Sequence, residues 1–316
     1  MDKGAKIYVA GHQGLAGSAI VRRLMAGGYA NLPLKTHAEL DLTRQAEVEA
    51  FLAREKPDYI FFAAGLVGGI AANQARRAEF IRQNIVMAAN IVHSAWLAGV
   101  GRLLYLGSSC IYPRDCPQPM QEECLLTGPL EETNAPYALA KIAGLKLCES
   151  YNRQYGVEYV VAMPTNLYGP GDRYDLENCH VLPALIRKAH EAKVGGKAEM
   201  TVWGSGEPRR EFLYADDLAD ACVFIMEHGD IRGGVLNVGS GKDLSVRELA
   251  GAVAAAVGFS GRLVFDPSRP DGTPRKLLDV EKLKTLGWEA RTSLAAGLPA
   301  TYGDFLAREV SGKGAS

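Results

Sequence analysis

The stretch Ile-Tyr-Val-Ala-Gly-His-Gln-Gly-Leu-Ala-Gly, residues 7–17, decides the fold of this chain. The apolar run Ile7–Ala10 is typical of a buried strand, and glycines follow at once at Gly11, Gly14 and Gly17. Further apolar residues then repeat at helical spacing: Ile20, Val21 and Leu24. A strand, a glycine turn and a helix in this order form the setting of a dinucleotide-binding motif, because the glycine backbone lets a pyrophosphate approach the positive end of the helix.

The glycine spacing is Gly-x-x-Gly-x-x-Gly rather than Gly-x-Gly-x-x-Gly. A glycine turn that binds nothing therefore stays open as an alternative for this motif alone. Beyond it, we expect a second apolar piece, acting as the second strand, near residues 32–35. The next helix would be capped by Asp41 or Thr43 and would run to Lys56.

The alternation of strands and helices continues, which predicts an α/β fold with a Rossmann-type doubly wound parallel sheet and a smaller C-terminal α/β lobe. Later strands are expected at residues 58–62, 103–106 and 157–163, and helices at about 75–98 and 137–155. The polar, proline-rich stretch 113–136 is expected to border a site rather than to build core. The alternation loosens near residue 165, so we expect a dinucleotide-binding domain over residues 1–165 and a substrate lobe over 166–316.

Composition excludes several classes of function. The formal net charge is −1, so we expect neither nucleic acid nor a membrane surface as a partner. The polar stretch 1–6 runs straight into the first strand, so no signal peptide is expected, and no apolar run reaches the length of a membrane span. The six cysteines contain no Cys-x-x-Cys pair and the six histidines are scattered, so no metal site is expected. Free thiols indicate a reducing, cytoplasmic compartment.

Two short motifs carry groups that can do chemistry. Tyr137 and Lys141 lie four residues apart and share one helix face, where an ammonium is expected to lower the pKa of the phenol. Such a tyrosine can donate a proton to a carbonyl oxygen. The segment Gly107–Cys110 follows a predicted strand, where parallel sheets bind ligands. The alternatives are a solvated helix surface for the pair, turn residues for the serines and a buried thiol for Cys110.

Together these motifs resemble those of the extended short-chain dehydrogenase/reductases, in which Ser, Tyr and Lys form the catalytic triad. The match is closer to one family among them, the GDP-L-fucose synthases, and it covers nearly the whole chain. The segments that carry this closer match are Val67–Ile70, Ser108–Pro113, Lys146–Asn152, Pro164–Pro170, His180–Pro183 and Pro270–Lys276. The resemblance implies conversion of GDP-4-keto-6-deoxy-D-mannose to GDP-L-fucose, by C3 and C5 epimerisation followed by reduction of the C4 ketone with NADPH.

The resemblance also implies a role for each catalytic residue. Ser108 and Tyr137 would hold the C4 oxygen, Tyr137 would protonate it, and Lys141 would also bind the nicotinamide ribose. Cys110 and His180 would exchange protons at C3 and C5, which the neighbouring ketone acidifies. A thiol with a pKa near about 8.5 and an imidazole with a pKa near about 6.5 can both exchange protons near neutral pH. A histidine that merely opens a helix stays the alternative for His180.

Binding roles follow from the same resemblance. The residues expected to contact NADP come from the glycine turn, the strand ends and the two lobes' facing loops: Gly11, His12, Gln13, Gly14, Leu15, Ala16, Gly17, His37, Asp41, Leu42, Leu106, Gly107, Ser108, Ser109, Lys141, Pro164, Thr165, Asn166, Leu167 and His180. The GDP-sugar would be held by Lys188, Trp203, Arg210 and Asp271, through cations for the diphosphate, an indole for packing and a carboxylate for sugar hydroxyls. Lone surface charges are the alternative for Lys188 and Arg210. The resemblance further implies a homodimer.

One departure from the family pattern concerns the adenosine 2′-phosphate. Bacterial members often place arginines in the glycine turn and after the second strand, where this chain has Gln13 and His37. Lys35 is nearby, and no acidic residue directly ends the second strand to repel a phosphate, although Glu39 is close. NADPH is therefore still expected, with a weaker preference over NADH.

Two other functions stay open. A related GDP-4-keto-6-deoxy-sugar reductase or epimerase would lack one of the two activities, although the presence of both Cys110 and His180 argues against a reductase alone. A non-catalytic NADP-binding sensor would keep the glycine turn and lose the triad, which is intact here as Ser108, Tyr137 and Lys141.

Overall fold

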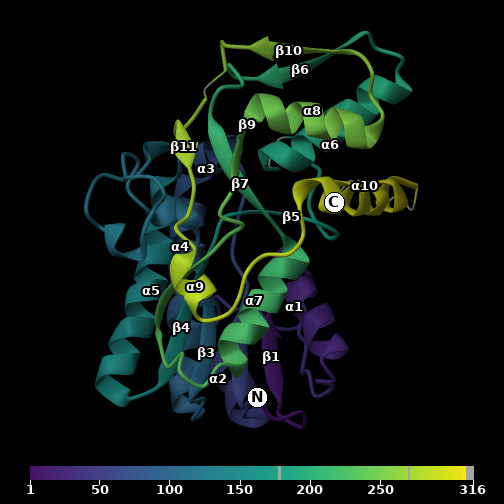
Figure 1. The fold of residues 1–316 in the computed structure, drawn as a ribbon. Coiled ribbons are helices and arrows are strands. Elements are labelled where there is room, and N and C mark those ends of the chain that lie inside the picture. The colour runs from purple at the N-terminus through teal and green to yellow at the C-terminus, as the bar shows by residue number, and fades with distance from the viewer. Residues whose placement is uncertain (177–178, 270, 311–316) are drawn as a thin grey trace.

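A parallel sheet of five strands, in the order β1-β2-β3-β4-β8, forms the centre of the larger lobe (Figure 1). The computed structural model describes residues 1–176, 179–269 and 271–310, so that Pro270 of the last motif quoted above lies outside the described residues. The expected doubly wound parallel sheet is confirmed. Its strands are β1 (Ile7–Ala10), β2 (Tyr59–Phe62), β3 (Arg102–Leu106), β4 (Glu158–Pro164) and β8 (Gly234–Val238).

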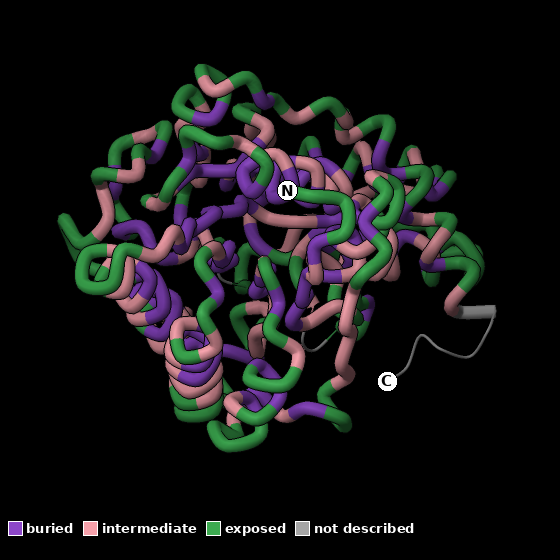
Figure 2. Tube along the Cα trace, turned by 90° about the horizontal axis from the view of Figure 1, so that it is seen from below, coloured by how far each residue is buried: buried purple, intermediate pink, exposed green. Residues whose placement is uncertain are grey.

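Helices cover both faces of this sheet, because its strands are apolar on both sides. Successive strand residues point to opposite faces, so Tyr8 and Val9 belong to two different core clusters. The face of Val9 is covered by α1 (Leu15–Ala26) and α7 (Ala215–Glu227). The face of Tyr8 is covered by α2 (Gln45–Glu55), α4 (Arg77–Leu97) and α5 (Ala135–Tyr155). Seen from below, the buried residues gather in the middle of the molecule (Figure 2).

The strand β8 and the helix α7 come late in the chain yet lie with this sheet. β8 pairs in parallel with β4, with Val235 opposite Val161. α7 packs beside α1, and Arg23 Nε of α1 lies 2.7 Å from Asp220 Oδ1 of α7. β8 therefore belongs to the sheet and α7 covers one of its faces, although both lie beyond the expected boundary at residue 165.

The prediction of a second strand at residues 32–35 is wrong. Residues 32–35, which the structure describes, do not form a strand. A backbone hydrogen bond from Ile7 N to Asn31 O, 3.0 Å long, holds the preceding turn beside β1. Leu32 and Leu34 instead pack their side chains against the core cluster under α1. Burial of these side chains explains the apolar pattern without a strand ladder.

The expected helix cap is also wrong. Arg44, not Asp41 or Thr43, immediately precedes α2. Asp41 Oδ1 accepts hydrogen bonds from N and Oγ1 of Thr43, at 2.9 and 2.8 Å, and so closes a turn before the helix begins. The helix expected at about 75–98 is α4, preceded by the short α3 (Ile70–Ala75).

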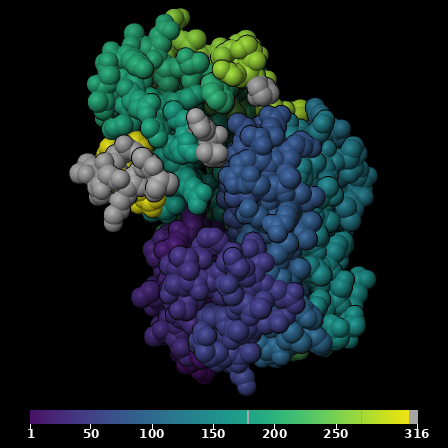
Figure 3. Space-filling model, turned by 180° about the vertical axis from the view of Figure 1, so that it is seen from behind, coloured from purple at the N-terminus to yellow at the C-terminus, as the bar shows by residue number. Residues whose placement is uncertain are grey.

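The second lobe packs helices on a pair of parallel strands. These elements are β6 (Glu199–Trp203), β10 (Arg262–Asp266), α6 (Val181–Val194), α8 (Val246–Val257) and α10 (Leu294–Val310). Leu185, Val253 and Phe305 lie in its separate core cluster. In Figure 3 this lobe lies above the N-terminal part of the chain. None of the described helices is long and apolar enough to cross a membrane.

A four-stranded sheet lies between the two lobes, in the order β11-β7-β5 with β9 also paired to β7 (Figure 1). Its strands are β5 (Asn166–Tyr168), β7 (Arg209–Tyr214), β9 (Asp243–Ser245) and β11 (Arg275–Lys276). The chain then continues through α9 (Glu281–Thr285) back toward the large sheet. We call this four-stranded unit the junction sheet.

The stretch 113–136 does more than border a site. Cys116 and Met120 are buried in the core of the larger lobe, so the expectation that this stretch builds no core is wrong in part. Asn237, at the end of β8, explains why the stretch folds inward. Its Oδ1 accepts a 2.6 Å hydrogen bond from Tyr112 Oη, and its Nδ2 donates to Met120 O at 2.9 Å.

Candidate active site

The glycine turn passes from β1 to α1 with no room for side chains. Gly11 has φ +83°, and a Cβ there would lie 2.7 Å from the backbone of Ala64. A Cβ on Gly17 would collide with the carbonyl oxygen of Gly11. Gly14 precedes α1, and no side chain caps that helix start. Nδ1 of His12 is buried with no hydrogen-bond partner among the described residues. A tight backbone cradle, an uncapped helix start and an orphaned polar atom fit a bound pyrophosphate.

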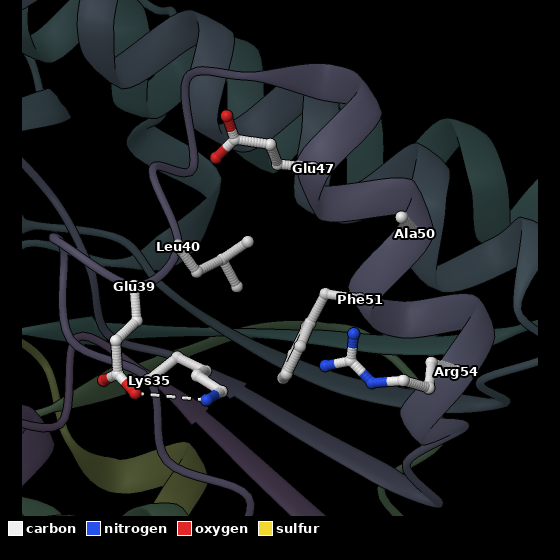
Figure 4. Close-up of a pocket in the computed structure, with 7 residues that line it drawn as sticks. All are labelled: Lys35, Glu39, Leu40, Glu47, Ala50, Phe51 and Arg54. Atoms are coloured by element: carbon white, nitrogen blue, oxygen red, sulfur yellow. Dashed lines mark hydrogen bonds and ion pairs between the residues drawn. The ribbon is translucent and has the colours of Figure 1, made fainter.

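The region expected to hold the adenosine contains both signs of charge. Gln13 and His37 are exposed there. Nζ of Lys35 lies 3.1 Å from Oε1 of Glu39, so the lysine charge already has a partner. Figure 4 shows the adjoining pocket of about 350 Å³, which lies against α2 and is lined by Lys35, Glu39, Leu40, Glu47, Ala50, Phe51 and Arg54. A phosphate in this region would compete with Glu39 for Lys35.

The end of β3 and the first turns of α5 bring the predicted triad together. Ser108 and Tyr137 share a hydrogen bond. Nζ of Lys141 donates to Leu106 O at 2.8 Å and lies 5.9 Å from the centroid of the Tyr137 ring. Oγ of Ser108 also accepts from Cys110 N at 3.3 Å, which fixes the start of the short helical turn Ser109–Ile111.

The expected lowering of the Tyr137 pKa is wrong. Burial raises the pKa of this phenol, the nearby Cys110 thiol raises it further, and the hydrogen bond with Ser108 lowers it in part. Lys141 is only 4% exposed, and burial lowers the pKa of its ammonium to about 8. Desolvation of the phenol raises its pKa more than the Lys141 ammonium could lower it, because that ammonium donates its hydrogen bond to Leu106 O and not to Tyr137.

The turn between β4 and β5 lies at the carboxyl end of β4, the strand that pairs with β3 in the sheet. Pro164 ends β4 and Leu167 lies in β5. Oγ1 of Thr165 and Nδ2 of Asn166 both donate to the carbonyl oxygen of Glu211, at 3.2 and 2.8 Å. The remaining predicted cofactor residues lie at three places: Leu15 and Ala16 at the start of α1, Asp41 and Leu42 in the turn before α2, and Gly107 and Ser109 just after β3.

Cys110 and His180 come from different lobes, and Lys276 of the junction sheet lies near both. Nζ of Lys276 is 3.8 Å from Sγ of Cys110. His180 directly precedes α6 and its side chain does not cap that helix. The His180 side chain is exposed to solvent, yet desolvation by the protein atoms around it lowers its pKa, and the charge of Lys276 lowers it further. The family resemblance implies no role for Lys276, although Lys276 ends the matching segment Pro270–Lys276.

The predicted substrate residues form two groups. Nζ of Lys188 lies 4.5 Å from the centroid of the Trp203 ring, and Trp203 is 51% exposed. In the second group, a guanidinium nitrogen of Arg210 donates to Asp271 O at 3.2 Å. Both carboxylate oxygens of Asp271 accept from Ser205, from its N and its Oγ, each at 2.8 Å. The Asp271 carboxylate is thus engaged within the protein.

Arg269 is a second residue near the predicted substrate group that no sequence motif indicates. Its guanidinium carbon lies 4.9 Å from the centroid of the Trp203 ring. Burial lowers the pKa of Lys188, the Cys179 thiol raises it, and the charge of Arg269 lowers it. Two cations beside one exposed indole would attract an anionic ligand. Among the described residues, no three His, Cys, Asp or Glu groups lie close enough to hold a metal ion.

Comparison with known proteins identifies the family. The model of the NAD dependent epimerase/dehydratase family matches residues 7–239, which span the sheet from β1 to β8. The chain belongs to this family. Within the epimerase/dehydratase family, GDP-L-fucose synthase 1 of Arabidopsis thaliana is 56% identical over 307 residues, covering 96% of this chain and 94% of the relative. The resemblance to the GDP-L-fucose synthases is therefore confirmed.

Two solved structures of related proteins contain NADP. A GDP-L-fucose synthetase from Naegleria fowleri bound to NADP has a TM-score of 0.89 and 26% identity, covering 99% of this chain and 97% of that one. A GDP-mannoheptose C4 reductase from Campylobacter jejuni with NADP bound has a TM-score of 0.86 and 38% identity, covering 97% and 99%. This epimerase/dehydratase fold thus serves both the synthetase and a C4 reductase.

Proposed function

We propose that this protein acts as a GDP-L-fucose synthase. It would convert GDP-4-keto-6-deoxy-D-mannose to GDP-L-fucose by epimerising C3 and C5 and then reducing the C4 ketone. The observation that carries this proposal is that two sets of proton-transfer groups meet at one place. Ser108, Tyr137 and Lys141 lie beside Cys110, and His180 faces the same Lys276 that contacts Cys110. The 56% identity to the Arabidopsis synthase supports the same substrate.

NADPH is the cofactor that the glycine turn and the strand ends fit. When bound, it supplies hydride to C4. The crowded backbone of Gly11 and Gly17 would hold its pyrophosphate, and the orphaned Nδ1 of His12 would gain a partner. The turn of Thr165 and Asn166 would line the nicotinamide, held in place by Glu211.

The residues of the triad would control the oxygen at C4. Ser108 and Tyr137 would donate hydrogen bonds to this oxygen, first stabilising the enolate formed during epimerisation and then the alkoxide formed on reduction. The raised pKa of Tyr137 keeps the phenol protonated at neutral pH, which suits a proton donor. Lys141 is protonated below its pKa of about 8. Its positive charge would stabilise the developing oxyanion.

Binding of the sugar nucleotide would involve both groups of predicted residues. Lys188 and Trp203 would bind one part of the GDP-sugar, and Arg210 and Asp271 would bind another part. We therefore assign substrate binding mainly to residues 166–316 and cofactor binding mainly to residues 1–165. We also propose isomerase activity together with oxidoreductase activity, a cytoplasmic location and a homodimer. All six cysteines are free in the structure, which suits a reducing compartment.

Deuterium exchange tests this function. The enzyme is incubated with GDP-4-keto-6-deoxy-D-mannose in D₂O without NADPH, and deuterium at C3 and C5 is read by mass spectrometry and NMR. We expect exchange at both carbons in the wild type. Cys110→Ser should largely stop it, because a hydroxyl is a far weaker base than a thiolate, and His180→Asn should impair it.

The same experiment identifies the alternative. The similarity to a C4 reductase at 38% identity makes reduction without epimerisation the second candidate. If the wild type reduces the substrate with NADPH yet incorporates no deuterium, the protein is a reductase of that kind. Exchange at the wild-type rate in both variants would remove Cys110 and His180 from the mechanism.

A further inference from the structure

The junction sheet carries four neighbouring cations on two adjacent strands. Parallel pairing sets Arg209 of β7 opposite Arg275 of β11, and Arg210 opposite Lys276. Because side chains alternate along a strand, each pair lies on its own face of the sheet. Each face of the sheet therefore holds two cations, and the two faces differ in the groups that surround those cations.

On one face, both cations are paired with a carboxylate. Arg209 Nε lies 3.0 Å from Oδ1 of Asp243, and Arg275 Nε lies 2.5 Å from Oδ2 of the same carboxylate. On the other face, no carboxylate of the described residues lies within 4.0 Å of Arg210 or Lys276. Arg210 donates to carbonyl oxygens, and Nζ of Lys276 donates to Sγ of Cys110 at 3.8 Å. Positive charge on this face is therefore directed at a thiol.

The backbone next to Lys276 is firmly held. Leu277 N donates to Oε1 of Gln118 at 2.8 Å, and Leu277 O accepts from Met120 N at 2.8 Å. Leu278 N donates to Oε2 of Glu211 at 3.0 Å, and both Leu278 and Glu211 are buried. These bonds fix the strand that carries the ammonium, so its approach to the sulfur is built into the fold.

We propose that Lys276 is a further functional residue of the epimerisation, whose ammonium stabilises the thiolate of Cys110. This inference rests on the proposed function and deepens it. The thiolate removes a proton from C3 or C5, leaving the thiol and an enolate, and His180 in its protonated form, which Lys276 disfavours, returns a proton to the opposite face of the carbon. Exchange with solvent restores both groups, while Lys276 keeps its own proton. An opposite charge at this distance favours the ionised form of the sulfur.

Other charged and titratable groups also face this pair. Tyr137 of α5 and Arg210 of β7 interact electrostatically with Cys110, and His180 before α6 interacts electrostatically with Lys276. The carboxylates of Asp271 and Glu131 interact electrostatically with Arg210. Of the two cations on this face, Lys276 is the one that contacts the sulfur, so its removal should have a measurable effect even with Arg210 in place.

Alkylation of Cys110 by iodoacetamide tests the proposal in the whole protein without substrate. The rate is followed against pH by mass spectrometry of the Cys110 peptide, with Cys110→Ser as the blank. Lys276→Met should raise the pH midpoint by about one unit, which is about tenfold slower alkylation at pH 7. Lys276→Arg keeps the charge and should keep the midpoint. Lys282→Met is the matched control, because Lys282 Nζ donates to Val235 O, away from the site, at 3.1 Å.

Deuterium exchange at C3 and C5 measures the catalytic consequence in the same variants. Lys276→Met should exchange about tenfold more slowly at pH 7 and recover toward pH 9, and Lys276→Arg should retain exchange. An unchanged alkylation midpoint in Lys276→Met, with only a raised KM for the keto sugar, would assign Lys276 to substrate binding and overturn the proposal. A shifted midpoint without any exchange in the wild type would instead refute the proposed function and leave the contact with Cys110 standing.

Discussion

Tyr137 lies among neighbours that change its proton affinity in opposite directions. Burial and the Cys110 thiol raise its pKa, and the hydrogen bond with Ser108 lowers it. The spacing of Tyr137 and Lys141 correctly places both on one helix, yet it cannot say how dry that helix face is. Desolvation therefore reverses the sign that the sequence predicts, and leaves a phenol that is protonated and ready to donate.

Replacing Tyr137 by Phe tests the proton donor directly. Tyr137→Phe should lower the rate of C4 reduction by at least about 10²-fold, because only the hydroxyl is lost. NADPH affinity, measured by fluorescence titration, should stay close to wild type, since Lys141 keeps its bond to Leu106 O. Tyr151→Phe is the control, because the Tyr151 hydroxyl on the same helix bonds to His93 instead. More than about a tenth of wild-type activity in Tyr137→Phe would exclude it as the acid.

At the scale of elements, the sequence predicts the central sheet well and the junction sheet poorly. Strands such as Tyr59–Phe62 are continuous apolar runs, because both faces of a parallel sheet are covered. β11 has two residues, Arg275 and Lys276, and its hydrogen-bonding partner lies more than sixty residues earlier, at Arg209 and Arg210. Neither periodicity nor propensity reports such a pairing, so the contact between Lys276 and Cys110 could not be foreseen.

We expect the segment that follows α1 to influence the choice between NADPH and NADH. We expect a higher kcat/KM for NADPH than for NADH, by less than a site with two arginines would give. Lys35, the cation of this segment, is paired with Glu39 (Figure 4). Glu39→Gln should release Lys35 and raise the NADPH preference severalfold. Glu49→Gln on α2 should not change it, because Glu49 Oε1 accepts a hydrogen bond from Gln45 and does not contact Lys35. Equal values of kcat/KM in the wild type would show that this segment does not recognise the 2′-phosphate.

At the scale of the whole molecule, the C-terminal helix returns to the loop that follows β5. Gly171 N donates to Oδ2 of Asp304 at 3.0 Å, and Arg308 donates to Asp172 O at 3.2 Å. A Cβ on Gly171 would lie 3.2 Å from Oγ of Ser18, so the same loop touches α1. The first and last helices are thus linked through this one loop, in which Asp172 and Tyr174 are buried.

Asp172, in this loop, should make the stability of the whole protein depend on pH. It is 8% exposed, and its Oδ2 has no hydrogen-bond partner among the described residues. Burial raises its pKa to about 7, with smaller effects from its charged neighbours. In the unfolded chain an aspartate has a pKa near about 3.9, so between pH 4 and 7 the folded protein binds more protons than the unfolded one. Stability should therefore fall as pH rises through this window.

The variant Asp172→Asn removes that titration, because an amide stays neutral and its Oδ1 can still accept from Arg173 N. We expect its Tm to exceed that of the wild type at pH 8 and the difference to vanish or reverse near pH 4, with about 2–4 °C for each kcal/mol of stability gained. Asp230→Asn, at an exposed position, should follow the wild-type curve throughout. Differential scanning calorimetry across pH 4–8 measures all three proteins. Parallel curves of Tm against pH for Asp172→Asn and the wild type would show that ionisation of this carboxyl does not destabilise the folded protein. The positive charge of Arg308 would then compensate the negative charge of Asp172.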